Sequence, residues 1–81
     1  MIVRVRLFAA PRELVGRPEV TFELPEGSTI ADLRVALAGE YPALAGVLPH
    51  CRFAAESDFA AESAGLVAGG EVACIPPVSG G

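Results

Sequence analysis

Two segments near the N-terminus, residues 1–9 and 19–24, alternate between apolar and polar side chains with a period of two. That period is typical of β-strands that bury one face, and two such strands joined by a short connection favour a hairpin. The inward-facing set is Val3, Val5 and Leu7, followed by Val20, Phe22 and Leu24. In the connection, Ala10–Gly16 predicts a single helical turn closed by Gly16, and we expect Glu23 to lie opposite an outward arginine.

A helix is predicted after the turn Pro25-Glu26-Gly27. Thr29 and Asp32 have the spacing of a capping box, in which a hydroxyl and a carboxylate accept hydrogen bonds from free amides at the start of a helix. The apolar residues that follow recur at helical spacing, as Ile30, Leu33, Leu37 and Tyr41. Gly39 and Pro42 are expected to end this helix.

The second half of the chain predicts two more strands, His50–Glu56 and Glu71–Ile75, after a short second turn at Ala43–Leu48. The segment Ser57–Ala68 between them is less regular and has room for one short strand. In this segment we expect Phe59, with Leu66 and Val67, to plug the edge of the core.

This order of elements predicts an α+β fold of the ubiquitin-like β-grasp type, with a mixed four- to five-stranded sheet and one main helix on one face. The other face is then partly open to water or to a partner. We expect residues 1–76 to form this domain and residues 77–81 to form a flexible, protruding C-terminal Gly-Gly tail.

Charge and hydropathy exclude several classes of function. Hydrophobic residues make up 52% of the 81 residues, which is too many for intrinsic disorder. With a formal net charge of −4, the chain has no basic surface for nucleic acid. No uncharged apolar run approaches the ~20 residues of a membrane span, and the N-terminal segment does not resemble a signal peptide. We therefore expect a cytoplasmic protein that binds neither nucleic acid nor a membrane.

The titratable side chains do not suggest a catalytic centre. Cys51 and Cys74 have neither metal-ligand spacing nor that of a disulfide framework, so we expect two reduced, buried thiols and no metal site. The single histidine, His50, is expected at the surface. Three acidic residues within 56–62 indicate either a solvated loop or a handle for a basic partner.

The last residues, Pro76-Pro77-Val78-Ser79-Gly80-Gly81, predict an arm. Two prolines supply no backbone N–H and favour polyproline II, so the last strand cannot simply continue. Residues 77–81 can project on the order of 15 Å. Because glycine has no Cβ, Gly80 and Gly81 could enter a narrow cleft and expose a carboxylate to reaction. Terminal glycines can equally be disordered ends without a function.

The tail PPVSGG resembles the C-terminal signature of the MoaD-type small subunit of molybdopterin synthase, a sulfur carrier of the ThiS/MoaD superfamily. The segment LFAAPRELVG resembles that family's first strand and the turn after it. The resemblance covers essentially the whole chain and is weakest across Glu56–Ala68. The sulfur carrier of thiamine synthesis also ends in Gly-Gly, but it is usually shorter and lacks the PPV(S/T)GG ending.

The resemblance implies a function in molybdenum cofactor biosynthesis. A partner similar to the ubiquitin-activating enzyme would adenylate the carboxylate of Gly81 with ATP, and sulfur from a persulfide donor would replace AMP to give a thiocarboxylate. Gly80 would be its required neighbour. The tail would insert into the large subunit of molybdopterin synthase, within a heterotetramer, and donate sulfur to cyclic pyranopterin monophosphate. The chain would be a non-catalytic subunit with no bound cofactor.

A docking surface is also indicated. Alternation places Phe8 on the outward side of the first strand as an interface anchor, although it could instead fold over the core. Arg12 matches a family arginine that contacts the activating enzyme, or is a solvated charge. Ile75 either packs against a partner or belongs to the core. The candidate partner-binding set is Phe8, Arg12, Ile75, Pro76, Pro77, Val78 and Ser79.

Two alternatives stay open at this point. The chain could carry sulfur for another pathway, such as thiamine synthesis or tRNA thiolation, or act as a ubiquitin-like modifier. It could also be a β-grasp interaction module with an inert tail. The PPVSGG ending favours the molybdopterin pathway.

Overall fold

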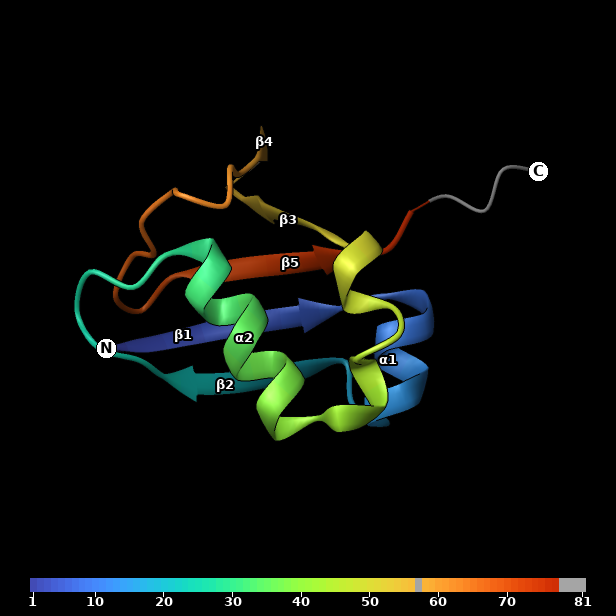
Figure 1. Ribbon diagram of the computed structural model, residues 1–81. Coiled ribbons are helices and arrows are strands. Elements are labelled where there is room, and N and C mark those ends of the chain that lie inside the picture. The colour runs from blue at the N-terminus through green and yellow to red at the C-terminus, as the bar shows by residue number, and fades with distance from the viewer. Residues whose placement is uncertain (57, 78–81) are drawn as a thin grey trace.

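A mixed sheet of five strands forms the centre of the molecule, in the order β2-β1-β5-β3-β4. The computed structural model describes residues 1–56 and 58–77 (Figure 1). The strands are β1 (Ile2–Leu7), β2 (Glu19–Glu23), β3 (Arg52–Ala55), β4 (Asp58–Phe59) and β5 (Glu71–Ile75). The central pair β1 and β5 is parallel, and the other neighbouring pairs are antiparallel.

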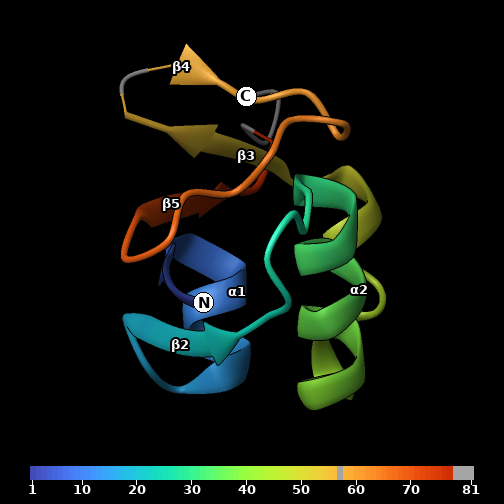
Figure 2. The same cartoon turned by 90° about the vertical axis from the view of Figure 1, so that its left-hand side faces the viewer.

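Two α-helices accompany the sheet. α1 (Ala9–Val15) lies in the connection between β1 and β2, and α2 (Ile30–Glu40) covers one face. Two short 3₁₀ helices, Pro42–Leu44 and Leu48–His50, lead from α2 into β3. Figure 2 shows α2 on one side of the sheet, while no helix of residues 1–56 and 58–77 covers the other side. The predicted β-grasp fold with one open face is confirmed.

The core lies between α2 and the inner face of the sheet. The apolar stripe of α2 is buried, with Ile30 only 1% exposed and Leu33 and Leu37 fully covered. The predicted inward residues of β1 are buried with them. The remaining buried hydrophobic residues are Val20, Leu44, Leu48, Cys51, Phe53, Val72 and Cys74. The residues predicted to be buried from the alternation in β1 and from the helical spacing in α2 therefore pack in the same core.

The predicted capping box starts α2. The Asp32 N–H donates to Thr29 Oγ1 at 3.3 Å, and the Thr29 N–H donates to Asp32 Oδ2 at 2.8 Å. The helix continues through Gly39 and ends at Glu40, where the N–H of Tyr41 donates to the Leu37 carbonyl at 2.8 Å.

α1 is longer than the predicted single turn. It spans 7 residues, and Pro11 lies in its first turn, where backbone amides have no partner within the helix and a proline is tolerated. Gly16 ends the helix at φ 81°, a left-handed conformation that favours glycine, and its N–H donates to the Arg12 carbonyl at 2.8 Å.

The prediction for Glu23 is wrong. Glu23 lies opposite Ile2, and the acidic residue opposite an arginine is Glu19, whose partner is Arg6. The connection through α1 is longer than a tight turn, so its length did not determine the register of the hairpin.

The prediction that Phe59 and Val67 plug the core is also wrong. Phe59 is 48% exposed and Val67 69% exposed, whereas Leu66 does pack against the core. Phe59 belongs to β4, an edge strand, and its partner there is Ala54, which follows the buried Phe53 and so faces outward.

The acidic segment is only partly a solvated loop. Asp58 lies in β4, and Glu62 forms an ion pair with Arg34 at 2.7 Å. Glu56 is exposed after the end of β3. Electrostatic binding of a basic partner by this acidic segment stays a prediction.

Candidate functional site

The chain leaves the domain from the middle of the sheet. β5 pairs with β1 on one side and with β3 on the other, and its last residue, Ile75, has Arg52 as its Cα partner. Because β1 and β5 are parallel, with Leu7 beside Cys74, both strands end at the same edge. Phe8, which follows β1, therefore lies at the edge from which Pro76 continues (Figure 1).

An apolar surface extends from this exit across the open face of the sheet to β4. Phe8 is 41% exposed and Phe59 48% exposed, while Ile75 is half-buried. The register across β4, β3 and β5 places Phe59, Ala54 and Ala73 in one row on the same face. We call this set the exit surface: Phe8, Ala54, Phe59, Ala73 and Ile75.

Two arginines border the exit surface. The guanidinium carbon of Arg52 lies 3.8 Å from the centroid of the Phe59 ring, and that of Arg6 lies 5.9 Å from the Phe8 ring. Both distances are within the range of a cation–π interaction. Two arginines thus border the exit surface, with Glu19 opposite Arg6 on β2, although the whole chain carries a formal net charge of −4. A complementary partner would present an apolar patch with acidic residues around it.

The structure brings most of the predicted partner-binding residues it describes to one end of the sheet. Phe8 is on the surface and not folded over the core. Arg12 is exposed on α1, Ile75 and Pro76 are half-buried, and Pro77 is exposed. Their contacts with a partner stay a prediction. The remaining predicted site residues, Val78, Ser79, Gly80 and Gly81, lie outside the described residues, so the boundary between domain and tail also stays a prediction.

Sequence reasoning missed Phe59 and Arg52 as parts of this site. β4 has only 2 residues, so it is too short to show a period of two. The signal that could have found them is an aromatic residue within an acidic, otherwise polar stretch, where it has little reason to be buried. The pairing of β3 with β5 then places Arg52 beside the exit.

Two buried thiols lie behind the exit surface. Cys51 and Cys74 are free and buried, as predicted. Burial raises the pKa of the Cys74 thiol to about 12 and also raises the pKa of Cys51, whose Sγ donates to the Val47 carbonyl at 3.3 Å. At pH 7 the Cys74 thiol is therefore protonated. These thiols are therefore poor nucleophiles.

The described residues contain neither a clustered metal site nor a membrane-spanning helix. Within 1–56 and 58–77, no three side chains of His, Cys, Asp or Glu gather closely enough to hold a metal ion. His50 is exposed, as predicted. None of the helices in this part of the chain is long and apolar enough to cross a membrane.

Comparison with known proteins decides the family, because the ThiS family matches residues 5–81. The chain belongs to the ThiS family. This ThiS-family chain is 40% identical to the molybdopterin synthase sulfur carrier subunit of Chlamydomonas reinhardtii, over 100% of both chains. It is 37% identical to the subunit of that name from Arabidopsis thaliana, over 98% of this chain and 82% of the relative.

Among solved structures, SAMP1 from Haloferax volcanii matches with a TM-score of 0.88 and 31% identity, covering 100% of both chains. The resemblance inferred from PPVSGG and LFAAPRELVG is confirmed.

Proposed function

We propose that this ThiS-family chain is the sulfur-carrier subunit of a molybdopterin synthase. The observation that carries the proposal is its similarity, across essentially its whole length, to sulfur carrier subunits from an alga and a plant. The exit surface supports it, because a partner bound to Phe8, Phe59 and Ile75 would meet the chain directly where it leaves β5.

The chemistry of the proposal takes place at the carboxylate of Gly81. A carboxylate oxygen attacks the α-phosphorus of ATP on an activating enzyme, and pyrophosphate leaves. The terminal sulfur of a persulfide then attacks the acyl carbon, and AMP leaves. A thiol cleaves the resulting sulfur–sulfur bond, forming a disulfide and releasing the thiocarboxylate. Transfer of that sulfur to cyclic pyranopterin monophosphate, with water supplying the oxygen, restores the carboxylate.

In this proposal the chain is a donor subunit and not a catalyst. The activating enzyme supplies the ATP site, and the large subunit of molybdopterin synthase binds the pterin and receives the tail, within a heterotetramer. Positioning is the contribution of this chain, since a bound and oriented carboxylate reacts far faster than a free one. The central position of β5, held on both sides, supports that role.

Intact-mass spectrometry tests the proposal. The chain is incubated with ATP, magnesium, a cognate activating enzyme and a persulfide donor. We expect a product heavier by the difference between one sulfur and one oxygen atom, and molybdopterin once the large subunit and the pterin are added. Failure to form an acyl-adenylate would overturn sulfur carriage. A thiocarboxylate that is never used by the large subunit would point to another sulfur pathway.

Deletion of Gly81 tests the role of the C-terminal residue separately from the stability of the folded domain. We expect the variant to form no thiocarboxylate, while its melting temperature stays within about 1 °C of the full chain, because terminal residues contribute little to stability. The measurement pairs intact mass with thermal denaturation. A large loss of stability would show that the tail packs against its own domain.

A second candidate, a ubiquitin-like protein modifier, is favoured by the match to SAMP1 and by 29% identity to small archaeal modifier protein 3 of Haloferax volcanii. In that case Gly81 would form an isopeptide bond with a lysine of another protein. Because the last arginine is Arg52 and the chain has no lysine, trypsin would leave residues 53–81 on a modified lysine. Mass spectrometry of tryptic peptides from cells distinguishes the two functions.

A further inference from the structure

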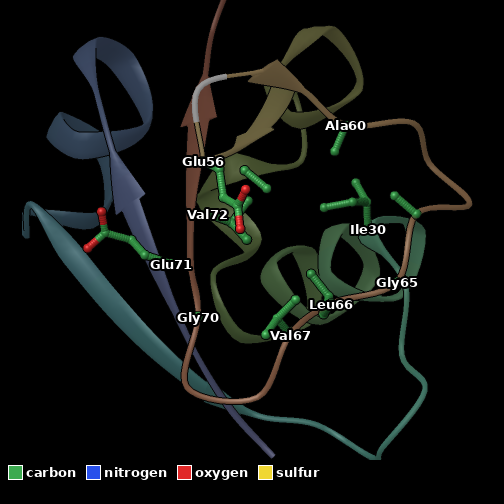
Figure 3. A pocket seen from close by; sticks show the side chains of 11 residues that line it. Ile30, Glu56, Ala60, Gly65, Leu66, Val67, Gly70, Glu71 and Val72 are labelled. Atoms are coloured by element: carbon green, nitrogen blue, oxygen red, sulfur yellow. The ribbon is translucent and has the colours of Figure 1, made fainter.

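A cavity opens at the start of β5, on the face of the sheet that α2 covers. It has a volume of about 210 Å³ and lies between the start of α2, the end of β3 and the segment that leads into β5 (Figure 3). Its floor belongs to the core, since Ile30 and Val72 are 1% and 4% exposed. Small-molecule sites usually measure ~300–1,000 Å³. This cavity is therefore of a size for one side chain and not for a cofactor.

The carboxylate of Glu56 is the charge at the mouth of the cavity. Figure 3 shows its side chain across the opening, whereas Glu71 points away. Glu71 lies 3.9 Å from Arg4, and the nearby Glu62 is paired with Arg34 at 2.7 Å. In the part of the chain that the structure describes, Glu56 has no such ion pair. It is thus available to a cation from outside.

The surrounding charge favours a cationic ligand. Residues 1–52 contain six acidic residues and all six arginines, so their formal charges cancel. Residues 53–81 contain four acidic residues and no arginine or lysine, and therefore carry the entire net charge of −4. Most of the cavity wall comes from this part, in which Glu71 and Glu62 are offset by Arg4 and Arg34, whereas Glu56 and Asp58 have no ion pair among the described residues. A cation is attracted to such a region before any contact forms.

We propose that this cavity binds a lysine side chain of a partner protein, with the methylene stem in the cavity and the ammonium group on Glu56. Lysine combines an apolar four-carbon stem with a compact charge. Arginine fits less well, because its apolar stem is one carbon shorter than that of lysine and its guanidinium is a wider, planar group. The cavity lies on the helix-covered face near the start of β5, whereas Pro76 continues from the end of β5, so a bound lysine leaves this exit free.

An NMR titration of the ¹⁵N-labelled chain tests this assignment. The probe is the peptide acetyl-Ala-Lys-Ala-amide, compared with peptides that carry norleucine or arginine in place of lysine. We expect millimolar binding of the lysine peptide, weaker binding of the other two, and shifts centred on Ala55, Leu66 and Val72. Glu56→Gln should weaken binding roughly five-fold, as for loss of one partly exposed ion pair. The matched control, Glu23→Gln on β2, should leave binding unchanged.

Filling the cavity gives an independent test. Ala64→Leu should abolish binding while the dispersed amide spectrum of the folded domain is retained, and Ala60→Leu serves if Ala64→Leu does not fold. The proposal is overturned if the lysine and norleucine peptides bind equally, if Glu56→Gln binds as well as the unaltered chain, or if the filled variants still bind. Shifts spread over acidic residues throughout the chain, or no shifts at all, would overturn it too.

Discussion

At the scale of single residues, Arg34 contacts several segments of the chain, and no sequence pattern predicted these contacts. From α2, its Nε and Nη2 donate to the two carboxylate oxygens of Glu62 at 2.9 and 2.7 Å. Its Nη1 donates to the Leu48 carbonyl and to the Cys51 carbonyl, the latter at 3.0 Å. The guanidinium carbon also lies 4.8 Å from the centroid of the Phe53 ring. One side chain thus joins the helix, the start of β3 and the loop before β5.

Arg34→Met should destabilise the domain much more than Glu62→Gln. Removal of the arginine takes charged hydrogen bonds from two backbone carbonyls, which should cost about 2 kcal/mol. Loss of the exposed carboxylate alone should cost roughly 0.5 kcal/mol. Urea denaturation of both variants measures the difference. Equal losses would mean that the ion pair, and not the carbonyl contacts, supplies the stability.

The Cys74 thiol predicts a loss of stability in alkali. Its pKa is raised to about 12 by burial, above that of a thiol in the unfolded chain, so the folded state holds its proton more tightly. The stability linked to this proton is complete at neutral pH and is lost as the pH rises from about 9 toward 12. The slope reaches at most ~1.4 kcal/mol per pH unit.

Denaturation between pH 8 and 10.5 measures this effect. Cys74→Ala should flatten the dependence of unfolding free energy on pH, even if it lowers stability at pH 7. An unchanged slope would assign the alkaline loss to other groups.

At the scale of elements, what the sequence could predict depended on the length of each element. The alternation of β1 and the stripe of α2 each repeat several times, so the buried faces were predicted correctly. β4 has 2 residues and offers no period, and Phe59 was therefore assigned to the core. The exit surface needs the order β1-β5-β3-β4, which brings Phe8 and Phe59 to one face although the sequence separates them widely. The order of the strands in the sheet depends on pairing between distant segments, so no local sequence pattern predicts it.

The capping box of α2 was predictable because all of its parts lie within four residues. Thr29→Ala should destabilise the domain by about 1 kcal/mol, since the Asp32 amide loses its acceptor. Thr29→Ser keeps the hydroxyl and should cost only a few tenths of that amount. Thermal or urea denaturation of the pair provides the measurement. A serine variant as weak as the alanine variant would assign the loss to the methyl group instead.

At the scale of the whole molecule, the exit surface and the cavity differ in charge as well as in shape. The exit surface is apolar and bordered by Arg6 and Arg52, whereas the cavity has at its mouth the carboxylate of Glu56, which has no ion pair among the described residues. Such a division lets partners distinguish the two regions by electrostatics before they make close contact.

Phe8→Asp should weaken binding of the synthase large subunit at least tenfold, because it places a charge in the apolar part of the exit surface. The isolated domain should stay folded, since Phe8 is 41% exposed. Val35→Asp is the matched control, because Val35 is 72% exposed on α2, away from the exit. Isothermal titration calorimetry measures the affinities. Equal weakening by both variants would contradict a specific role for Phe8.

The position of β5 has a mechanical consequence. A protein that grips the chain at Pro76 and pulls would load β5 along its own axis. Ladders to β1 and β3 flank the strand, so their hydrogen bonds would resist together in shear. An edge strand under the same traction could be peeled away one bond at a time. Force applied to the chain at Pro76 would thus be shared across the sheet.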